Sequence, residues 1–242
     1  MPDTSKKIRL DKFLTQAAEL TRSEARQIIK KGKVDVGGEI VKKPEYKVST
    51  QERVCIDGEE VVYEQFRYIM LHKPAGVISA TESAEDRTVL DLITNGKKGL
   101  FPVGRLDKDT EGLLLLTNDG ALAHNLLSPK KHVDKKYFAV LDGPVGEEEQ
   151  KLFSQGLDIG DEKLTLPAKL ELTEKDNEVF ITVCEGRFHQ VKRMAQAVGR
   201  KVTYLKRISM GSLVLDAALE KGEYRPLFEQ ELSKLLQEDS YK

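Results

Sequence analysis

The sequence of 242 residues has a formal net charge of −1, a hydrophobic share of 39% and a charged share of 33%. This length and composition suit a globular protein of one large or two modest domains, whose core needs no disulfide or metal to hold it. They exclude a membrane-spanning protein, because the longest aliphatic run, residues 113–116, is far too short to cross a bilayer, and we expect no membrane partner.

Residues 1–60 are predicted to form a compact module of two helices followed by strands. Apolar residues at a helical spacing mark the first helix: Leu10, Phe13, Leu14 and Ala17. Thr21 and Glu24 have the spacing of a capping box, which predicts a second helix that ends near Gly32. Alternating apolar residues around a Gly-Gly turn at 34–41 predict a β-hairpin, and residues 54–56 continue the pattern.

The same module contains the first of two basic zones. Residues 6–47 carry twelve Lys or Arg against six Asp or Glu. Phosphate contacts need local positive potential and not a high overall charge, so this zone favours a polyanionic partner. A solvated helix face is the plain alternative.

The larger domain, residues 61–242, begins in the polar stretch 57–65 and is predicted to consist mainly of strands. A strand at 67–71 should end near Lys73-Pro74, because proline cannot donate to a β-ladder. Further strands are predicted at 113–117, 137–141, 168–172, 179–184, 202–208 and 213–215, and helices at 121–127, 147–155, 189–198 and 228–236. The fold class is therefore α+β: a small N-terminal α/β module and a larger domain built on a mixed, mainly antiparallel β-sheet with flanking helices.

A charged loop bounded by Gly104 and Gly112 leads into the predicted strand at 113–117. Strand ends hold loop side chains rigidly, so Asp107 or Asp109 is well placed to meet a substrate. A loop of solvated charges, with Asp as a turn former, is the alternative. The four histidines are too scattered to indicate a metal site, and the familiar nucleotide-binding and hydrolase motifs are absent, so we expect neither metal nor cofactor.

A basic run opens the predicted strand that follows, at 135–141. Tyr137 and Phe138 point to opposite faces of this strand. One ring is therefore expected in the core, while the other is free to stack on a base.

The second basic zone, residues 185–207, carries seven Lys or Arg against one acidic residue. Its first part, 185–194, is a strand-to-helix junction rich in donors that suit a phosphate or a carboxylate: Arg187, His189, Gln190, Lys192 and Arg193. The acidic segments 142–178 (four basic against eleven acidic residues) and 212–242 (four against seven) cancel the two basic zones. Such segregation is typical of a protein that meets a polyanion with part of its surface.

The N-terminus and the cysteines predict a cytoplasmic protein. The first residues, MPDTSKKIRL, are positively charged but precede neither an apolar stretch nor a cleavage site, so we expect no secretory signal. The two cysteines, Cys55 and Cys184, each stand alone in an apolar stretch, which is typical of buried thiols in a reducing compartment.

The segments 104–120 (GRLDKDTEGLLLLTNDG), 136–137 (KY) and 185–194 (EGRFHQVKRM) together resemble the pseudouridine synthases of the RsuA type. Residues 9–13, 21–26 and 34–38 resemble the S4 RNA-binding domain that precedes them in that family. The likeness covers roughly residues 7–232. The ending GEYRPL at 222–227 is most similar to members that act on small-subunit ribosomal RNA.

This resemblance implies an isomerase that converts a uridine in RNA to pseudouridine without a cofactor. The N1–C1′ glycosidic bond breaks and C5 joins C1′. The resemblance implies Asp107 as nucleophile, Lys192 as its cationic partner and Tyr137 as the active-site tyrosine that lies against the uracil. A cation beside the carboxylate would keep it charged in a sheltered site. Arg187 and Arg193 are alternatives to Lys192.

The target uridine must be turned out of its stack, which needs contacts to the nucleotide and its flanking phosphates. Candidates for these contacts in the larger domain are Arg105, Arg187, His189, Gln190 and Arg193. Candidates in the S4-like module, which would grip structured RNA by its backbone, are Arg9, Lys12, Arg22, Arg26, Lys30 and Lys31. The expected partner is ribosomal RNA, as a small-subunit assembly intermediate, and the protein is expected to be a monomer.

Three other functions remain open. A large-subunit ribosomal RNA pseudouridine synthase of the same family would share the motifs. A non-catalytic S4-type RNA-binding or ribosome assembly factor would have an inert second domain. A glycosidase would use Asp107 and Asp109 as a carboxylate pair, since hydrolysis also cleaves a glycosidic bond.

Overall fold

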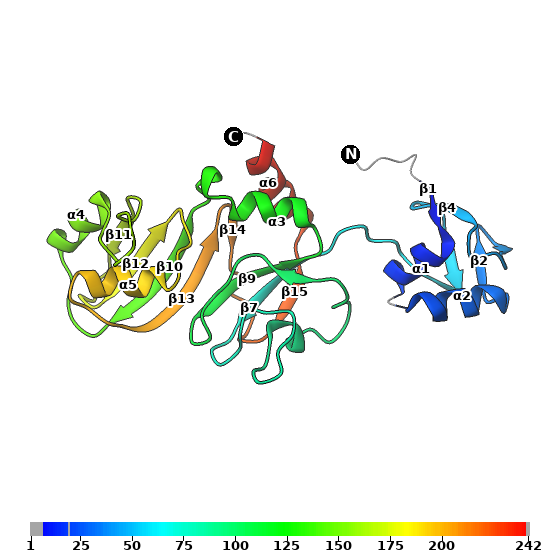
Figure 1. Ribbon diagram of the computed structural model, residues 1–242, viewed down its shortest axis with the longest axis horizontal. Helices are drawn as coiled ribbons and strands as arrows, with labels where there is room; N and C mark the ends of the chain where they lie inside the picture. Colours follow the sequence, from blue (N-terminus) through cyan, green and yellow to red (C-terminus); the bar gives the residue numbers. More distant parts are fainter. Residues whose placement is uncertain (1–6, 19, 241–242) are drawn as a thin grey trace. The chain divides into compact units, whose positions relative to one another are not determined.

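The computed structural model describes residues 7–18 and 20–240 (Figure 1). The chain divides into two compact units, Met1–Phe66 and Arg67–Lys242, which are described separately below. Within the described residues, no helix has the length and apolar character needed to span a membrane.

The first unit combines two helices with two small antiparallel sheets. One sheet pairs β1 (Lys7–Arg9) with β4 (Lys47–Ser49). The other has the order β3-β2-β5-β6. The helices are α1 (Leu10–Ala17) and α2 (Arg22–Lys30), and the remaining strands are β2 (Val34–Val36), β3 (Glu39–Ile40), β5 (Val54–Ile56) and β6 (Glu59–Glu60). The predicted helices and hairpin are confirmed, whereas the short, polar strands β1, β4 and β6 carry too little alternation to be predicted.

The capping box of α2 forms as the spacing predicts. The Thr21 side chain accepts from the Glu24 backbone N–H at 3.2 Å, and the Glu24 carboxylate accepts from the Thr21 N–H at 2.7 Å. The apolar faces of both helices then close over the strand valines in one core, formed by Leu10, Phe13, Leu14, Ala25, Ile29, Val34, Val36, Val48 and Val54.

The division between the units lies six residues beyond the boundary predicted at residue 60. Val61 N–H donates to the Val54 carbonyl at 2.8 Å, which continues the pairing of β5 and β6. The Tyr63 ring lies 5.1 Å from that of Phe13, and its hydroxyl donates to Gln16 at 2.8 Å. The polar stretch as far as Tyr63 therefore packs with the first unit.

The second unit is built on a nine-stranded mixed sheet with the order β11-β12-β10-β13-β9-β7-β15, to which β8 and β14 add short edges. The strands are β7 (Tyr68–Lys73), β8 (Phe101–Pro102), β9 (Glu111–Thr117), β10 (Lys135–Leu141), β11 (Lys169–Leu172), β12 (Glu178–Val183), β13 (Val202–Met210), β14 (Leu213–Val214) and β15 (Tyr224–Pro226). Their pairings are antiparallel except for β9 with β13, which confirms the predicted fold class.

Four α-helices and two short 3-10 turns accompany this sheet. The helices are α3 (Gly120–Leu127), α4 (Glu147–Gln155), α5 (Gln190–Ala197) and α6 (Glu229–Ser240), and the turns are Val89–Leu92 and Pro129–Lys131. Figure 1 shows α4 and α5 beside the half of the sheet that contains β10 and β13, and α3 and α6 beside the half that contains β7 and β9. The predicted helices are confirmed to within a few residues at their ends, whereas β8, β15 and the 3-10 turns were not predicted.

The two halves of the sheet meet where β9 runs parallel to β13 over two residue pairs. Gly112 of β9 lies opposite Arg207 of β13 and has a φ of +105°. A Cβ atom at Gly112 would lie 2.2 Å from the Arg207 carbonyl oxygen, closer than any two such atoms can approach. Glycine is therefore required here, and it brings the two backbones into direct contact.

Each face of β7 and β9 packs into a separate core. Leu71 and Leu114 join the cluster that includes Tyr137, whereas Met70 and Leu113 join the cluster under α3 and α6. This alternation follows from the two-residue period of a strand buried on both faces. Of the two rings on β10, Tyr137 is the one in the core. Phe138 is half-buried on the opposite face, with its ring 5.5 Å from that of Phe180 and 6.2 Å from that of Tyr204.

Candidate active site

The loop between β8 and β9 is fixed from beneath by a buried lysine at the end of β7. The Lys73 ammonium group is fully buried and donates to the carbonyl oxygens of Asp107 at 2.9 Å and Thr110 at 2.8 Å, with longer bonds to those of Pro74 and Lys108. Burial lowers the pKa of Lys73 to about 8, against the opposing effect of the nearby carboxylates. Four backbone acceptors thus hold this loop in one conformation.

A second set of bonds holds the loop at Leu106. The Ser79 hydroxyl accepts from the Leu106 N–H at 3.0 Å and donates to the Leu106 carbonyl at 2.9 Å. The Leu106 side chain is itself buried in the core. Asp107, the next residue, therefore starts from an anchored backbone.

The Asp107 carboxylate meets two groups from the start of α5. Lys192 Nζ lies 2.9 Å from Asp107 Oδ2, and His189 Nε2 lies 3.4 Å from Asp107 Oδ1. The same lysine lies 2.6 Å from Asp109 Oδ1. Asp107 retains 25% of its side-chain exposure and Asp109 retains 72%. The fold thus brings together four groups that the sequence places in two distant segments.

The electrostatics of this cluster favour its charged state. Burial opposes the charge of Lys192, but its hydrogen bonds to Asp109 and Asp107 outweigh burial and raise its pKa above the ordinary value. The hydrogen bond from Lys192 in turn lowers the pKa of Asp109. A partly exposed carboxylate beside a permanent ammonium group is suited to nucleophilic or electrostatic chemistry on a bound ligand.

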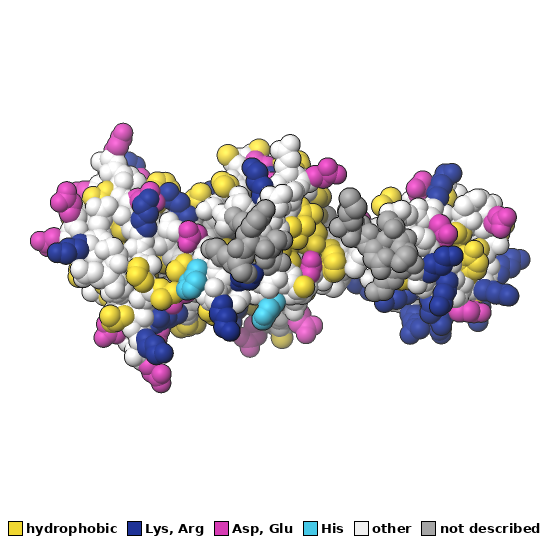
Figure 2. Space-filling model, turned by 90° about the horizontal axis from the view of Figure 1, so that it is seen from above, with side chains coloured by type: hydrophobic (Ala, Val, Ile, Leu, Met, Phe, Trp, Pro, Cys, Tyr) yellow, Lys and Arg dark blue, Asp and Glu magenta, His cyan; other side chains and the backbone are white. Residues whose placement is uncertain are grey.

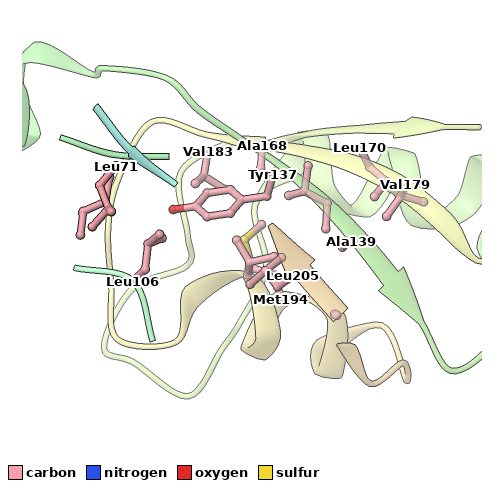
Figure 3. Packing of buried hydrophobic residues seen from close by; sticks show 14 of the residues in the cluster. Leu71, Leu106, Tyr137, Ala139, Ala168, Leu170, Val179, Val183, Met194 and Leu205 are labelled. Atoms are coloured by element: carbon pink, nitrogen blue, oxygen red, sulfur yellow. The ribbon is translucent and has the colours of Figure 1, made fainter. Parts of the chain in front are cut away.

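Tyr137 lies in the core that also contains Leu106 of this loop. Figure 3 shows its ring among Val183, Met194 and Leu205, with its hydroxyl pointing toward Leu106, the residue before Asp107. The ring is 9% exposed. A strand residue that is buried as a core aromatic thus directs its polar end at the loop that carries Asp107.

Three of the predicted phosphate-binding residues hold the protein's own backbone instead. Arg187 donates to the carbonyls of Lys163 and Leu164, both at 2.7 Å, and Arg193 donates to the carbonyl of Ile159 at 3.0 Å. Gln190 accepts from the Arg187 N–H at 2.9 Å and donates to Glu185 at 2.9 Å. These side chains therefore have protein partners, and contact with phosphates stays a prediction for them.

The two arginines are also corrected as alternatives to Lys192. Their acidic partners are Glu185 and Asp161, and in the described part of the chain neither makes an ion pair with Asp107. Arg105, in contrast, is exposed next to the loop, and the contacts of the described residues include no ion pair for it.

In the first unit, three predicted RNA-binding arginines converge on a carboxylate that the sequence analysis did not single out. Asp11 is 1% exposed and lies 2.8 Å from Arg9, 3.1 Å from Arg26 and 3.8 Å from Arg22. The hydrogen bond from Arg9 outweighs burial and lowers the pKa of Asp11 to about 2. The sequence holds one signal for this cluster: Asp11 stands between the apolar residues Leu10 and Phe13 in the first turn of α1, the part of the helix that is buried.

The other predicted basic residues of this unit, Lys12, Lys30 and Lys31, are exposed. Figure 2 shows Lys and Arg side chains gathered on the visible face of the unit. Over residues 7–18 and 20–240, no group of three or more His, Cys, Asp or Glu side chains is arranged to hold a metal ion.

Residues 67–197 match the RNA pseudouridylate synthase family, and residues 8–54 match the S4 domain. The chain is 47% identical to an uncharacterized RNA pseudouridine synthase of Bacillus subtilis, over 94% of this chain and 98% of the relative. It is 40% identical to ribosomal small subunit pseudouridine synthase A of Haemophilus influenzae, over 95% of this chain and all of that protein. A crystal structure of a pseudouridylate synthase superposes with a TM-score of 0.68 at 40% identity, over 94% of this chain and 99% of the other.

Proposed function

Because the chain belongs to the RNA pseudouridylate synthase family and carries an S4 domain at its N-terminus, we propose that it isomerises a specific uridine of small-subunit ribosomal RNA, with Asp107 as the nucleophile. The observation that carries this proposal is the pairing of the Asp107 carboxylate with the Lys192 ammonium group at 2.9 Å in a partly exposed site. The name of the Haemophilus relative, aligned over its whole length, supports the small ribosomal subunit as the source of the substrate.

In the proposed reaction the uridine is turned out of its stack and enters the site between the loop and α5. The Asp107 carboxylate acts on the nucleoside, the N1–C1′ bond breaks, and the uracil reattaches through C5. C5 loses a proton and N1 gains one, so the product has the mass of the substrate. Lys192 compensates the charge of Asp107 before and after the exchange, and Tyr137 lies against the uracil.

The first unit supplies the grip on RNA in this proposal. Its exposed lysines and its arginine cluster present positive charge to the phosphate backbone, which suits recognition of A-form RNA by shape. The proposal extends to an immature small subunit as the natural substrate, to action as a monomer and to a cytoplasmic location.

The glycosidase alternative is less favoured by the electrostatics of the pair. A glycosidase needs one carboxyl group that stays protonated to act as an acid. Lys192 contacts both Asp107 and Asp109, and its hydrogen bond lowers the pKa of Asp109, so Asp109 does not have an environment that keeps a proton. A purely RNA-binding factor would have no need for this arrangement.

The test compares cells that lack the protein with cells that carry it or a variant. We expect one small-subunit ribosomal RNA position to lose its pseudouridine and to regain it with the wild-type chain. Asp107→Asn should not restore it, because loss of a nucleophile typically lowers turnover by about a thousandfold or more. Asp109→Asn is the matched control and should stay within about tenfold of wild type, because this more exposed carboxylate only shares Lys192.

Two outcomes would contradict the proposal separately. A modified position in the large subunit would overturn the substrate but leave the chemistry. Near-normal turnover of purified Asp107→Asn on ribosomal RNA would overturn the assignment of the nucleophile.

A further inference from the structure

We propose that Phe188 and His189 form an aromatic platform at the rim of the active site, on which a nucleobase adjacent to the target uridine stacks. This inference rests on the proposed function and adds a contact for the RNA around the reacting nucleotide. Phe188 is 73% exposed, which is unusual for so large an apolar side chain. The residue lies in the strand-to-helix junction that supplies Lys192 to the active site.

The two rings form a stack that extends outward from the reacting carboxylate. His189 Nε2 lies 3.4 Å from Asp107 Oδ1. The Phe188 ring lies on the His189 ring with centroids 3.8 Å apart and planes inclined by 19°. The Phe188 ring is therefore stacked directly on the imidazole that contacts Asp107. The ring thus lies close to the carboxylate at which the uridine would react.

The platform is held rigidly by its own backbone. His189 has a φ of +49°, a conformation that a side chain other than glycine adopts at a cost and keeps only where its surroundings impose it. Arg193 donates to the Phe188 carbonyl at 3.1 Å, and Gln190 accepts from the Arg187 N–H at 2.9 Å. Strained backbone of this kind is concentrated at functional sites.

The neighbouring segment braces this junction from the other side. Arg187 donates to the carbonyls of Lys163 and Leu164, and Glu185 accepts from the Leu166 N–H at 2.9 Å. Arg187, which the sequence suggested as a contact for phosphates, thus helps to fix the position of Phe188. A ring fixed before binding loses little conformational freedom when a ligand stacks on it.

A nucleobase is the ligand that suits an exposed ring in this position. Turning out one nucleotide leaves its neighbours with unstacked faces, and aromatic side chains are the usual surface on which such bases stack. The surrounding cations, Lys192 at the site and the exposed Arg105, suit the phosphates on either side of that base. An apolar peptide would gain nothing from these charges.

The first experiment measures turnover on unmodified small-subunit ribosomal RNA transcribed with C5-tritiated uridine, by the release of tritium. Phe188→Leu should lower kcat/KM by about tenfold to a hundredfold, the usual effect of losing one base–aromatic stack. Phe188→Tyr keeps an aromatic face and should stay within about threefold of wild type. Phe228→Leu is the matched control, because Phe228 is also exposed but stacks on Arg225 near α6 and should leave turnover unchanged.

The second experiment exploits the absence of tryptophan from the chain. Phe188→Trp introduces a single fluorophore at the platform, and Phe228→Trp introduces one at the control position. We expect the same transcript to quench the emission of the Phe188→Trp variant and to leave that of the Phe228→Trp variant unchanged, since stacking on a base quenches indole fluorescence.

The outcomes separate this inference from the proposed function. Equal turnover of Phe188→Leu and wild type, an equal loss in Phe188→Leu and Phe188→Tyr, or equal quenching at both tryptophan positions would overturn the platform while the wild-type chain still forms pseudouridine. Failure of the wild-type chain to form pseudouridine in any ribosomal RNA would instead overturn the proposed function.

Discussion

Asp11 in the S4 domain and Asp107 in the synthase domain are carboxylates held at nearly the same distance from a cation, 2.8 and 2.9 Å. Their surroundings differ in the number of neighbouring cationic groups and in exposure to solvent. Asp11 is 1% exposed and lies within 3.8 Å of three guanidinium groups, whereas Asp107 is 25% exposed and has one ammonium group and one imidazole beside it. The distance to a cation therefore does not distinguish a structural carboxylate from the proposed nucleophile, but burial and the number of donors do.

The type of cation strengthens this distinction. A guanidinium group is planar and presents several donors in a fixed fork, and Arg9 uses two of them on the two oxygens of Asp11, at 3.0 and 2.8 Å. A lysine ammonium group is a single point charge on a flexible stem. Lys192 thus compensates the charge of Asp107 through one oxygen, Oδ2, while the other, Oδ1, faces the imidazole of His189 at the longer distance of 3.4 Å.

The largest effect should come from removing the single cation beside Asp107. We expect Lys192→Met to lower kcat/KM by about a hundredfold to a thousandfold, the usual range for loss of one preorganised charged group. Lys192→Arg should recover all but about tenfold, because the pair is electrostatic more than geometrically exact. The measurement is tritium release from ribosomal RNA labelled at C5 of uridine.

Lys108 provides the matched control for this prediction. It lies in the same loop, but its ammonium group pairs with Asp86. Lys108→Met should stay within about threefold of wild type, because exposed ion pairs contribute little. A similar loss in both variants would mean that Lys192 has no special role.

A smaller effect, on stability and not on turnover, is expected from a substitution of Asp11. Asp11→Asn should lower the free energy of unfolding of the first unit by about 2 kcal/mol, because three cations lose their shared counter-charge. Amide hydrogen exchange of peptides from α1 and α2 should then quicken by about thirtyfold, with exchange in β7 and β9 unchanged.

The exposed pair of Lys33 and Asp57 gives the comparison within the same unit. Asp57→Asn should change the free energy of unfolding by no more than about 0.5 kcal/mol, since exposed pairs are screened by solvent. If Asp11→Asn and Asp57→Asn change the free energy of unfolding equally, the burial of Asp11 adds nothing to the stability of the unit.

The charge of Asp11 should also make the stability of the first unit depend on pH. The pKa of Asp11 is about 2 in the folded chain against an ordinary value of 3.8, so the charged carboxylate stabilises the unit above about pH 4. This stability, roughly 2 kcal/mol in full, should be mostly lost as the pH falls from 4 to 2. Hydrogen exchange of α1 against pH should show this loss in the wild-type chain and a flatter profile in Asp11→Asn.

Local patterns in the sequence were sufficient for most of the longer elements, because each of these depends on a short period. The helical spacing from Leu10 to Ala17, the capping box at Thr21 and the apolar run of β9 all appear in the structure as predicted. The approach of Lys192 to Asp107 followed from the resemblance to a family and not from spacing. The two residues are far apart in the chain, and only the fold brings them together.

What escaped prediction depends on contacts between distant segments. Nothing local marks Lys73 as the residue whose ammonium group will meet carbonyls 34 to 37 residues further along. Likewise, the sequence does not show that Arg187 and Arg193 have partners within the protein. Their partners are backbone carbonyls of residues 159–164, which only the fold brings close to them. A charge in a sequence shows what a side chain can bind, and the fold decides whether protein or ligand takes that place.

Gly112 stands in the most recognisable motif of the chain, yet it touches none of the reacting groups. Its lack of a side chain is dictated by Arg207, a residue 95 positions later, at the seam where the two halves of the sheet join. The motif thus contains a residue required by the packing of the sheet as well as residues proposed for the chemistry. An alanine at position 112 would push the two halves of the sheet apart, and with them the loop that carries Asp107 and the helix that carries Lys192.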